Sequence, residues 1–234
     1  YIHDGEYAKL NGHKGICSES EWAQVKRDIE IAEKVGCRYH VCHISTKETV
    51  ALVREAKARG GQVTCGTGAH YLIFTEVDLE EDARWKMNPP LRSAEDRAAL
   101  IEGIKDGTID MIATDHAPHS VEEKSKGLKD SAMGIVGLET AFAALNTHLV
   151  RKGVISLERL IELMSYNPRR VFRIEGGLEV GDRADIVLLD TEKAWRVDSE
   201  KFYSMGKISM FDGRDMVGDI AMTIHRGEVV YKAE

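Results

Sequence analysis

The chain lacks several features that assign a protein to a common class. No apolar run approaches about 18 residues, the length at which a segment is taken for a membrane-spanning helix, and no signal peptide is seen at the start. Neither a GxGxxG nor a GxxxxGK[ST] motif is present, so dinucleotide and P-loop binding are not supported. The GxSxG nucleophile elbow is also absent. We therefore expect no membrane partner and no serine-type chemistry.

Positive charge and cysteine are both in short supply. The 32 Lys and Arg residues face 39 Asp and Glu, and the net charge of -7 predicts no nucleic-acid partner. The four cysteines (Cys17, Cys37, Cys42 and Cys65) include no CxxC pair, so they suit free thiols in a reducing compartment better than a disulfide framework or a zinc knuckle. We expect a cytoplasmic protein in which Cys42 and Cys65, inside apolar strand-like runs, are packed.

The length of the chain and its start bear on how complete the protein is. With 234 residues, 43% of them hydrophobic, the chain can form one large domain or two smaller ones. Tyr1–Gly5 has no initiator Met and is predicted to be a loop. We expect a fragment of a longer chain.

Predicted strands and helices alternate through the first half of the sequence. Apolar strands are predicted over 38–43, 62–65 and 110–114. Helices are predicted over 18–36, 45–60 and 93–107, and each opens on a capping-box pattern: Ser18 with Glu21, Ser45 with Glu48, and Ser93 with Asp96. This alternation is typical of right-handed βαβ units and a parallel sheet. Polar residues where each strand ends favour a (β/α) barrel over a doubly wound sheet.

The pattern changes in the second half. A polar loop over 120–133 has the length of an active-site cover, and helical patterns follow over 138–150, over 157–165 and after 167. A turn-rich stretch from 176 leads to a strand over 184–190 and a hairpin over 221–231. We predict an α/β fold in which residues 1–175 form part of a (β/α)8 TIM-type barrel. Residues 176–234 are predicted to form a small β-sandwich-like module.

The strongest candidate for chemistry is Asp115, which follows the third predicted strand within Thr114–His119. Barrel enzymes place their chemistry at the carboxyl ends of the strands. Asp115 could hold a cation and shuttle a proton, and His119 could hold an anionic substrate. An acid after a strand can equally cap the next helix, but the crowding of His116 and His119 favours the functional interpretation.

Two more positions fit a site at the same edge. His40 and His43 are an odd number of residues apart, so on a regular strand they face opposite sides, and the strand-end His43 is the better metal ligand. The alternative for a lone histidine is a core side chain bonded to a backbone carbonyl, which we expect for His40. Two prolines fix the backbone after Asn88, whose amide could then bind a planar amide or ring edge. The alternative for Asn88 is an ordinary turn before a helix. His70 follows another strand end and is a weaker candidate for a residue that supports the metal ligands without binding the metal itself.

Four ordered motifs carry a family resemblance. They are His40–Glu48 (HVCHISTKE), Lys86–Arg92 (KMNPPLR), Ala113–His119 (ATDHAPH) and Gly134–Thr140 (GIVGLET). Together they resemble the C-terminal part of the dihydroorotase family, which belongs to the amidohydrolase superfamily. The resemblance runs from about His3 to the end of the chain.

The resemblance implies a function and roles for individual residues. It implies a zinc-dependent hydrolase of cyclic amides that interconverts N-carbamoyl-L-aspartate and dihydroorotate in pyrimidine synthesis. His43 would bind one of two Zn²⁺ ions, and Asp115 would bind the other and act as general base. Asn88, His119 and the backbone around Met133 and Gly134 would hold the substrate. A homodimer, or association with other pyrimidine enzymes, is also implied.

The sequence departs from the family pattern in several places. The HxH pair of the first barrel strand, the bridging carboxylate and the fifth-strand histidine are absent from this chain. Met133 stands where relatives often have an aromatic residue, and Gly68–His70 replaces a more usual Thr-Pro-His. We therefore expect the 234-residue chain by itself to be inactive. The alternatives are a hydantoinase (dihydropyrimidinase) or allantoinase, and a non-catalytic amidohydrolase-like scaffold that binds a partner enzyme.

Overall fold

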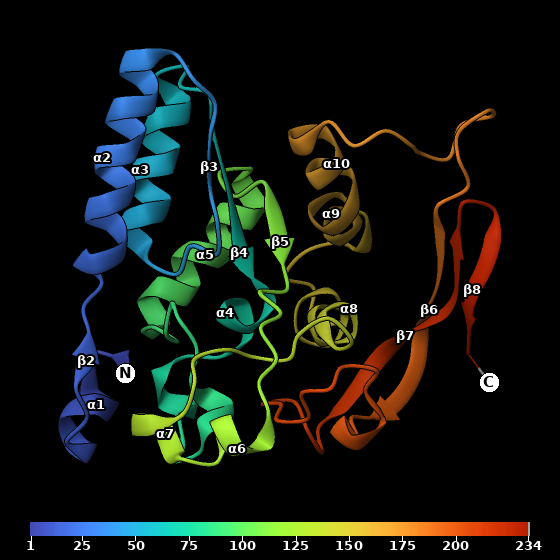
Figure 1. Ribbon diagram of the computed structural model, residues 1–234. Coiled ribbons are helices and arrows are strands. Elements are labelled where there is room, and N and C mark those ends of the chain that lie inside the picture. The colour runs from blue at the N-terminus through green and yellow to red at the C-terminus, as the bar shows by residue number, and fades with distance from the viewer. Residues whose placement is uncertain (234) are drawn as a thin grey trace. The chain divides into compact units, whose positions relative to one another are not determined.

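The computed structural model describes residues 1–233, which divide into two compact units (Figure 1). The first unit contains residues 1–139 and 199–212, and the second contains residues 140–198 and the chain from 213 onward. These units do not coincide with the predicted division at residue 175. The assignment of residues 1–175 to a barrel and of 176–234 to a β module remains a prediction.

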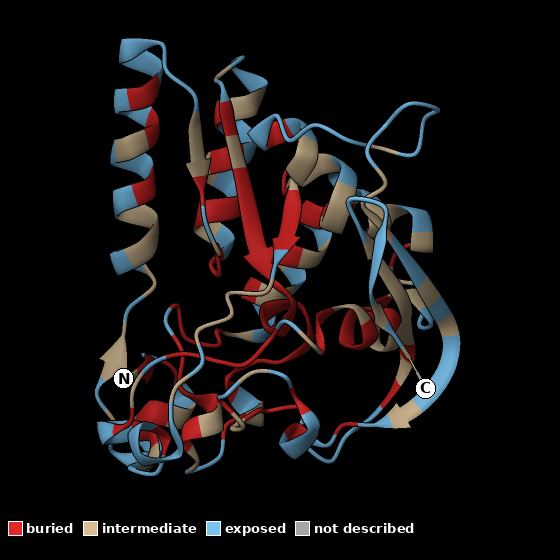
Figure 2. Cartoon of the chain, turned by 45° about the vertical axis from the view of Figure 1, so that its right-hand side comes forward, coloured by how far each residue is buried: buried red, intermediate tan, exposed pale blue. Residues whose placement is uncertain are grey.

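A three-stranded parallel sheet lies at the centre of the first unit. Its order is β3-β4-β5, formed by Tyr39–Val41, Val63–Gly68 and Met111–Ala113. The three strands predicted from the sequence are confirmed, and so is their parallel arrangement. Figure 2 shows β4 and β5 as buried strands. Because the strands are parallel, their carboxyl ends meet at one edge of the sheet, where the candidate residues follow.

Helices flank this sheet in the order that βαβ units require. α2 (Glu19–Val35) packs against α3 (Lys47–Ala58), and α3 packs against α5 (Ala94–Asp106). Val25, Ile29 and Ala32 are the buried residues of α2, at the spacing of one helical face. α3 joins β3 to β4, and α5 precedes β5, so each helix returns the chain to the amino end of the next strand.

One of the three predicted capping boxes is confirmed and two are wrong. The Ser93 side chain accepts the Asp96 amide, and Asp96 bonds back to Ser93. Ser18 makes no side-chain cap, and the cap of α3 is Thr46 rather than Ser45. Glu21 is not available to cap α2 because its carboxylate is bonded to the segment that follows β3, as described below.

Several short elements complete the first unit. They are β1 (Ile2–His3) and β2 (Gly15–Ile16), which pair in parallel, and α1 (Glu6–Asn11), α4 (Ala69–Ile73), α6 (Val121–Lys124) and α7 (Gly127–Asp130), with 3₁₀ turns over Glu76–Asp78, Ala83–Trp85 and Ser199–Lys201. The predicted cover over 120–133 thus contains two single-turn helices. All four cysteines are free, and Cys65 is buried as expected. The expectation of a packed Cys42 is wrong, because β3 ends at Val41 and leaves Cys42 exposed.

The second unit combines helices with an antiparallel sheet. The helices are α8 (Ala141–Leu145), α9 (Leu157–Ile161) and α10 (Asn167–Phe172), with π-helical turns over Asn146–Val150 and Glu162–Tyr166. The sheet order is β6-β7-β8, formed by Ile186–Arg196, Asp215–His225 and Glu228–Lys232. The predicted hairpin is confirmed as β7 and β8, although β6 and β7 are longer than predicted. Within residues 1–233, no helix has the length and apolarity needed to cross a bilayer.

Candidate active site

The chain turns sharply at His43, directly after β3. The backbone of His43 is in the left-handed region, with φ of 39°. The Ile44 amide then donates to the Gly66 carbonyl (2.8 Å), and the Thr67 hydroxyl donates to the Ile44 carbonyl (2.8 Å). A left-handed conformation at a non-glycine residue costs energy and is maintained only by the surrounding structure. Here the bonds from β4 supply that constraint, so the place of His43 is fixed.

A buried cluster holds the next residues of this turn. Glu21 accepts the backbone amides of Ser45 (3.0 Å) and Thr46 (3.1 Å) and the Thr49 hydroxyl (2.9 Å). The Arg92 guanidinium, 4% exposed, donates to the Ser45 hydroxyl (3.1 Å) and lies 3.9 Å from the Glu21 carboxylate. The cluster connects the turn after His43 to the end of the Lys86–Arg92 segment.

Asp115 occupies the equivalent place after β5. Its φ is 49°, which is again left-handed, and its side chain is half-buried. Within residues 1–233 the Asp115 carboxylate makes no hydrogen bond and no ion pair. The next residue is fixed differently, because the His116 ring Nδ1 accepts the Gly137 amide (3.2 Å). His116 therefore serves the backbone of the 134–140 motif, and Asp115 is left available.

His70 lies at the end of β4, between the two strand ends already described. It is 1% exposed, and its ring centroid is 3.9 Å from that of Tyr71. Burial, with the nearby His43, lowers the pKa of His70 to about 3, so the ring is neutral. Two buried imidazole nitrogens have no hydrogen-bond partner within residues 1–233, Nε2 of His70 and Nδ1 of His43. Orphaned polar atoms of this kind are rare in folded proteins and require an explanation.

Tyr71 connects this edge to Asn88. Its hydroxyl donates to the Pro89 carbonyl (2.6 Å), which fixes the residue directly after Asn88. Asn88 itself is exposed between the buried residues Met87 and Pro89. Its role in binding a substrate amide remains a prediction. Burial, with the charge of Asp115, raises the pKa of Tyr71 well above its usual value. Tyr71 therefore lies within electrostatic reach of Asp115 while it holds the Asn88 segment.

The remaining predicted residues meet along the loop after β5. The His119 ring Nε2 bonds to the Met133 carbonyl (3.0 Å), and the Gly134 amide donates to the Lys86 carbonyl (3.0 Å). Gly134 has φ of 155°, and a Cβ there would overlap the Ala117 carbonyl oxygen, so only glycine fits. Met133 is exposed. The backbone thus joins His119, Met133 and Gly134 to the segment that carries Asn88.

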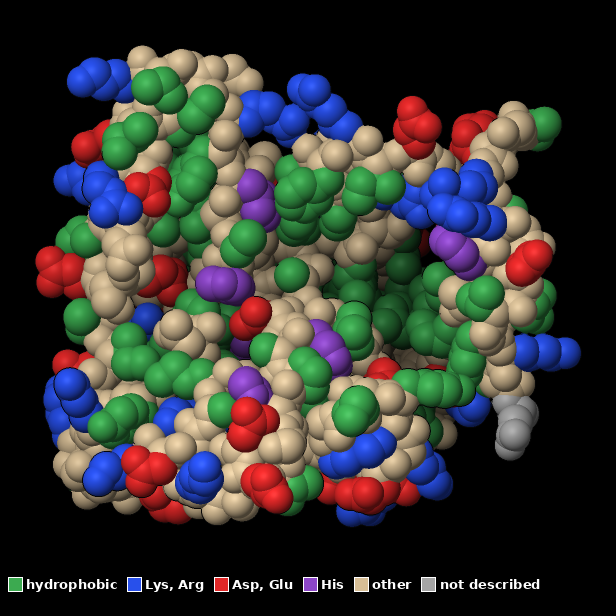
Figure 3. Space-filling view, viewed as in Figure 1, with side chains coloured by type: hydrophobic (Ala, Val, Ile, Leu, Met, Phe, Trp, Pro, Cys, Tyr) green, Lys and Arg blue, Asp and Glu red, His purple; other side chains and the backbone are tan. Residues whose placement is uncertain are grey.

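A metal ion would fit these residues as part of a larger ligand set. Neutral imidazole nitrogens and carboxylate oxygens are the usual donors to Zn²⁺. His43 offers a buried nitrogen with no partner, and Asp115 offers a half-buried carboxylate. Several histidine side chains lie in the central part of the face shown in Figure 3, whereas acidic side chains are spread over the whole face. Among the residues described, however, no group of three or more His, Cys, Asp or Glu side chains is arranged to hold a metal.

His40 bonds to a neighbouring strand, although this bond is to a side-chain hydroxyl and not to the backbone carbonyl that we expected. Its Nδ1 bonds to the Thr64 hydroxyl (2.8 Å) on the neighbouring strand. Two contributors were not recognised in the sequence. Glu21 resembles the third residue of a capping box, and Tyr71 has no motif signal at all. Glu21 lies on α2 and Tyr71 on α4, and their contacts with the segment after β3 and with Pro89 arise from the fold and not from a local pattern.

The fold and the site define a class of protein, and comparison with known proteins agrees. Residues 4–230 match the model of the amidohydrolase family. The chain belongs to the amidohydrolase family.

Curated relatives narrow the similarity. The chain is 51% identical to a dihydroorotase from Listeria innocua over 232 residues, and 49% identical to a dihydroorotase from Bacillus licheniformis over 233 residues. These matches cover 98% and 99% of this chain but 54% of each relative. The chain therefore spans about half the length of the curated relatives it matches.

Solved structures share the fold. An L-hydantoinase (dihydropyrimidinase) from Arthrobacter aurescens superposes with a TM-score of 0.85 at 38% identity, covering 90% of this chain and 48% of that one. An inactive dihydroorotase-like domain from Chaetomium thermophilum gives a TM-score of 0.66 at 22% identity, covering 86% of this chain and 53% of that one. The second likeness shows the fold alone.

Proposed function

We propose that the full-length protein is a metal-dependent cyclic amide hydrolase, a dihydroorotase that interconverts N-carbamoyl-L-aspartate and dihydroorotate. The observation that carries this proposal is the 51% identity to a dihydroorotase across nearly the whole chain. The Lys86–Arg92 segment supports the choice of substrate, because the structure presents Asn88 beside the loop that carries His119 and Gly134.

His43 and Asp115 would hold metal, and two Zn²⁺ ions are expected in the full-length enzyme with ligands from beyond these residues. Bound zinc supplies a polarised amide carbonyl and a water of lowered pKa. The Asp115 carboxylate accepts the proton of the water whose oxygen attacks the ring carbonyl carbon. The C–N bond then breaks, and Asp115 returns the proton to the leaving amide nitrogen. An Asp115 carboxylate without a protein partner is free to act in both steps.

The substrate would be held by residues on the joined segments. The Asn88 amide offers a donor and an acceptor to the planar ring amide. His119 and the backbone at Met133 and Gly134 would hold the carboxylate. We also infer that residues 1–175 form part of a (β/α)8 barrel and residues 176–234 a small β module. The parallel β3-β4-β5 sheet and the antiparallel β6-β7-β8 sheet support this inference.

A hydantoinase is the second candidate, because a solved L-hydantoinase is 38% identical to this chain. Dihydroorotate carries a carboxylate that unsubstituted hydantoin lacks, so the two functions differ in what the His119 side of the site must bind.

A substrate panel tests the proposal. The full-length protein, loaded with zinc, is assayed with dihydroorotate, hydantoin and allantoin. We expect turnover of dihydroorotate and much slower turnover of the others. Turnover of hydantoin or allantoin without dihydroorotate would overturn the proposed substrate. Turnover of none of them would favour the non-catalytic scaffold. The 234-residue chain assayed alone should show no turnover.

A further inference from the structure

Lys124, at the end of α6, is a buried ammonium whose partners are all backbone oxygens. It is 6% exposed, and its Nζ donates to the carbonyls of Lys86 (3.0 Å), Ala132 (3.1 Å) and Gly134 (2.9 Å). Within residues 1–233 the ammonium forms no ion pair with a carboxylate. Burying a charge without a counter-charge is costly, and it is tolerated here because each of the three N–H groups has an acceptor.

The three carbonyls belong to two segments that carry predicted substrate contacts. Lys86 precedes Asn88 by two residues, and Ala132 and Gly134 flank Met133. The Gly134 amide also donates to the Lys86 carbonyl (3.0 Å). The two segments are therefore joined once through the backbone and again through the Lys124 ammonium, which contacts both.

His119 is connected to the same arrangement. A carbonyl oxygen only accepts, so the 3.0 Å contact between His119 Nε2 and the Met133 oxygen places the ring proton on Nε2. The other ring nitrogen lies 3.5 Å from the Glu123 carboxylate, on the same short helix as Lys124. The orientation of the His119 ring therefore depends on where the 132–134 segment lies.

We propose that Lys124 is a positioning residue for substrate binding, fixing the 86–88 and 132–134 segments so that Asn88, His119, Met133 and Gly134 face one ligand together. This inference rests on the proposed function of those four residues. Its consequence is specific. Loss of the ammonium weakens binding of a cyclic amide, and most strongly of one that carries a carboxylate, while Asp115 and His43 keep their places on other strands.

The test uses the full-length, zinc-loaded enzyme. The concentration of active enzyme in each assay is calculated from the zinc that is bound. Lys124→Met keeps an unbranched side chain one atom shorter and removes the donors, and Lys124→Gln keeps two donors without the charge. Lys126→Met is the matched control, because Lys126 is an exposed lysine of the same loop. We expect Lys124→Met to raise KM for dihydroorotate about tenfold or more, because the groups that bind the substrate are misplaced. It should change kcat less than about threefold. Lys124→Gln should fall between, and Lys126→Met should match the wild type.

A role confined to stability would lower the folded fraction and leave KM unchanged, and that result would overturn the proposal. If Lys124→Met does not fold, the KM of Lys124→Gln is used in its place. A raised KM supports the positioning role, and an unchanged KM overturns it.

Amide hydrogen exchange over residues 132–136 gives a readout that needs no activity. It should be faster in Lys124→Met or Lys124→Gln than in Lys126→Met, and unaltered exchange would also overturn the proposal. The wild-type substrate panel separates this inference from the proposed function. If the wild type turns over hydantoin instead of dihydroorotate, the proposed substrate is wrong. The positioning role of Lys124 is then tested by the KM for hydantoin and by the amide hydrogen exchange.

Discussion

An aspartate lies at each end of strand β5, and the two carboxylates differ in their interactions. Asp110 precedes the strand, and its carboxylate accepts the Lys57 ammonium (2.8 Å) and the Cys65 amide (2.8 Å). Asp115 follows the strand, has a left-handed backbone, and makes no hydrogen bond or ion pair within residues 1–233. One acid joins β5 to neighbouring elements through Lys57 and Cys65, and the other is the residue that we propose as a metal ligand.

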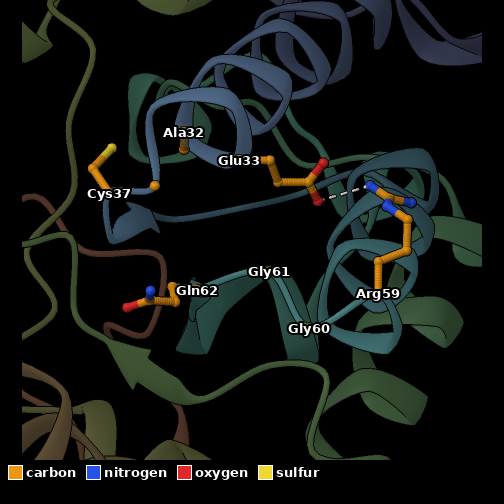
Figure 4. A pocket seen from close by; sticks show the side chains of 8 residues that line it. Ala32, Glu33, Cys37, Arg59, Gly60, Gly61 and Gln62 are labelled. Carbon is orange, nitrogen blue, oxygen red and sulfur yellow. Dashed lines mark hydrogen bonds and ion pairs between the residues drawn. The ribbon is translucent and has the colours of Figure 1, made fainter.

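The same contrast extends across the sheet. At the amino end, a hollow of about 320 Å³ is lined partly by Glu33 and Arg59, which pair at 3.0 Å (Figure 4). At the carboxyl end, ring nitrogens of His43 and His70 are buried without partners. Glu33 and Arg59 at the amino end pair with each other, whereas these two imidazole nitrogens at the carboxyl end have no protein partner within residues 1–233. If the proposed barrel and site are correct, this contrast matches the division between a stabilising end and a reactive end of parallel strands in barrel enzymes.

The largest expected effect is at the unpaired acid. Asp115→Asn keeps the shape of the side chain and removes its ability to accept a proton. In the full-length, zinc-loaded enzyme we expect kcat for dihydroorotate to fall about 10³-fold or more. Because no partner is lost, the free energy of unfolding should change by less than about 0.5 kcal/mol. Turnover within tenfold of the wild type would remove Asp115 from the mechanism.

Glu21 also lies at the carboxyl end of the sheet, but its carboxylate is bonded to the segment after His43. It therefore provides a second acid to compare with Asp115. Glu21→Gln removes the charge that holds the backbone after His43. We expect zinc affinity of the full-length enzyme to fall about 10–100-fold, since groups that orient a ligand affect metal binding by that amount. Competition with a chelator measures the change. Glu33→Gln, at the opposite end, is the control and should leave zinc affinity as it is.

The paired acid should show the reverse pattern from Asp115. Asp110→Asn weakens the bonds to Lys57 and Cys65, and we expect the unfolding free energy to fall by about 2 kcal/mol, the typical value for hydrogen bonds to a charged group. Denaturant titration measures it. For the folded enzyme, kcat/KM should stay within about threefold of the wild type. A large loss of kcat/KM with unchanged stability would contradict the division between the two ends.

The smallest effect concerns the thiols. Burial, with the nearby Asp110, raises the pKa of Cys65 to about 12, so below that pH the thiol remains protonated as well as inaccessible. Cys17, Cys37 and Cys42 are exposed. Alkylation at pH 9 should therefore be much slower at Cys65 than at these three exposed thiols. Mass spectrometry of the native protein shows whether a fourth adduct forms at a comparable rate.

Much of the fold could be predicted because the first unit follows simple periodic rules. The strands over 38–43, 62–65 and 110–114 and the intervening helices were all found, and Ser93 with Asp96 forms the predicted box. The two failed boxes share one cause. A Ser-x-x-Glu pattern is local, but the Glu21 carboxylate is used by residues about 25 positions further along the chain, and no local rule detects such a contact.

The site was predicted in part for the same reason. His43 and Asp115 end apolar runs, and Asn88 precedes two prolines, so each has a local signal. Tyr71, which bonds to Pro89, and Lys124, which bonds to three carbonyls, have none, because their importance arises from contacts across the fold. The orphaned nitrogens of His43 and His70 likewise appear only when burial and partners are known.

We propose that the carboxyl end of this sheet holds metal through His43 and Asp115. Anomalous scattering at the zinc edge from crystals of the full-length enzyme locates the metal. We expect zinc peaks within bonding distance of the His43 imidazole and of the Asp115 carboxylate. A fully loaded enzyme whose zinc lies away from both residues would contradict it.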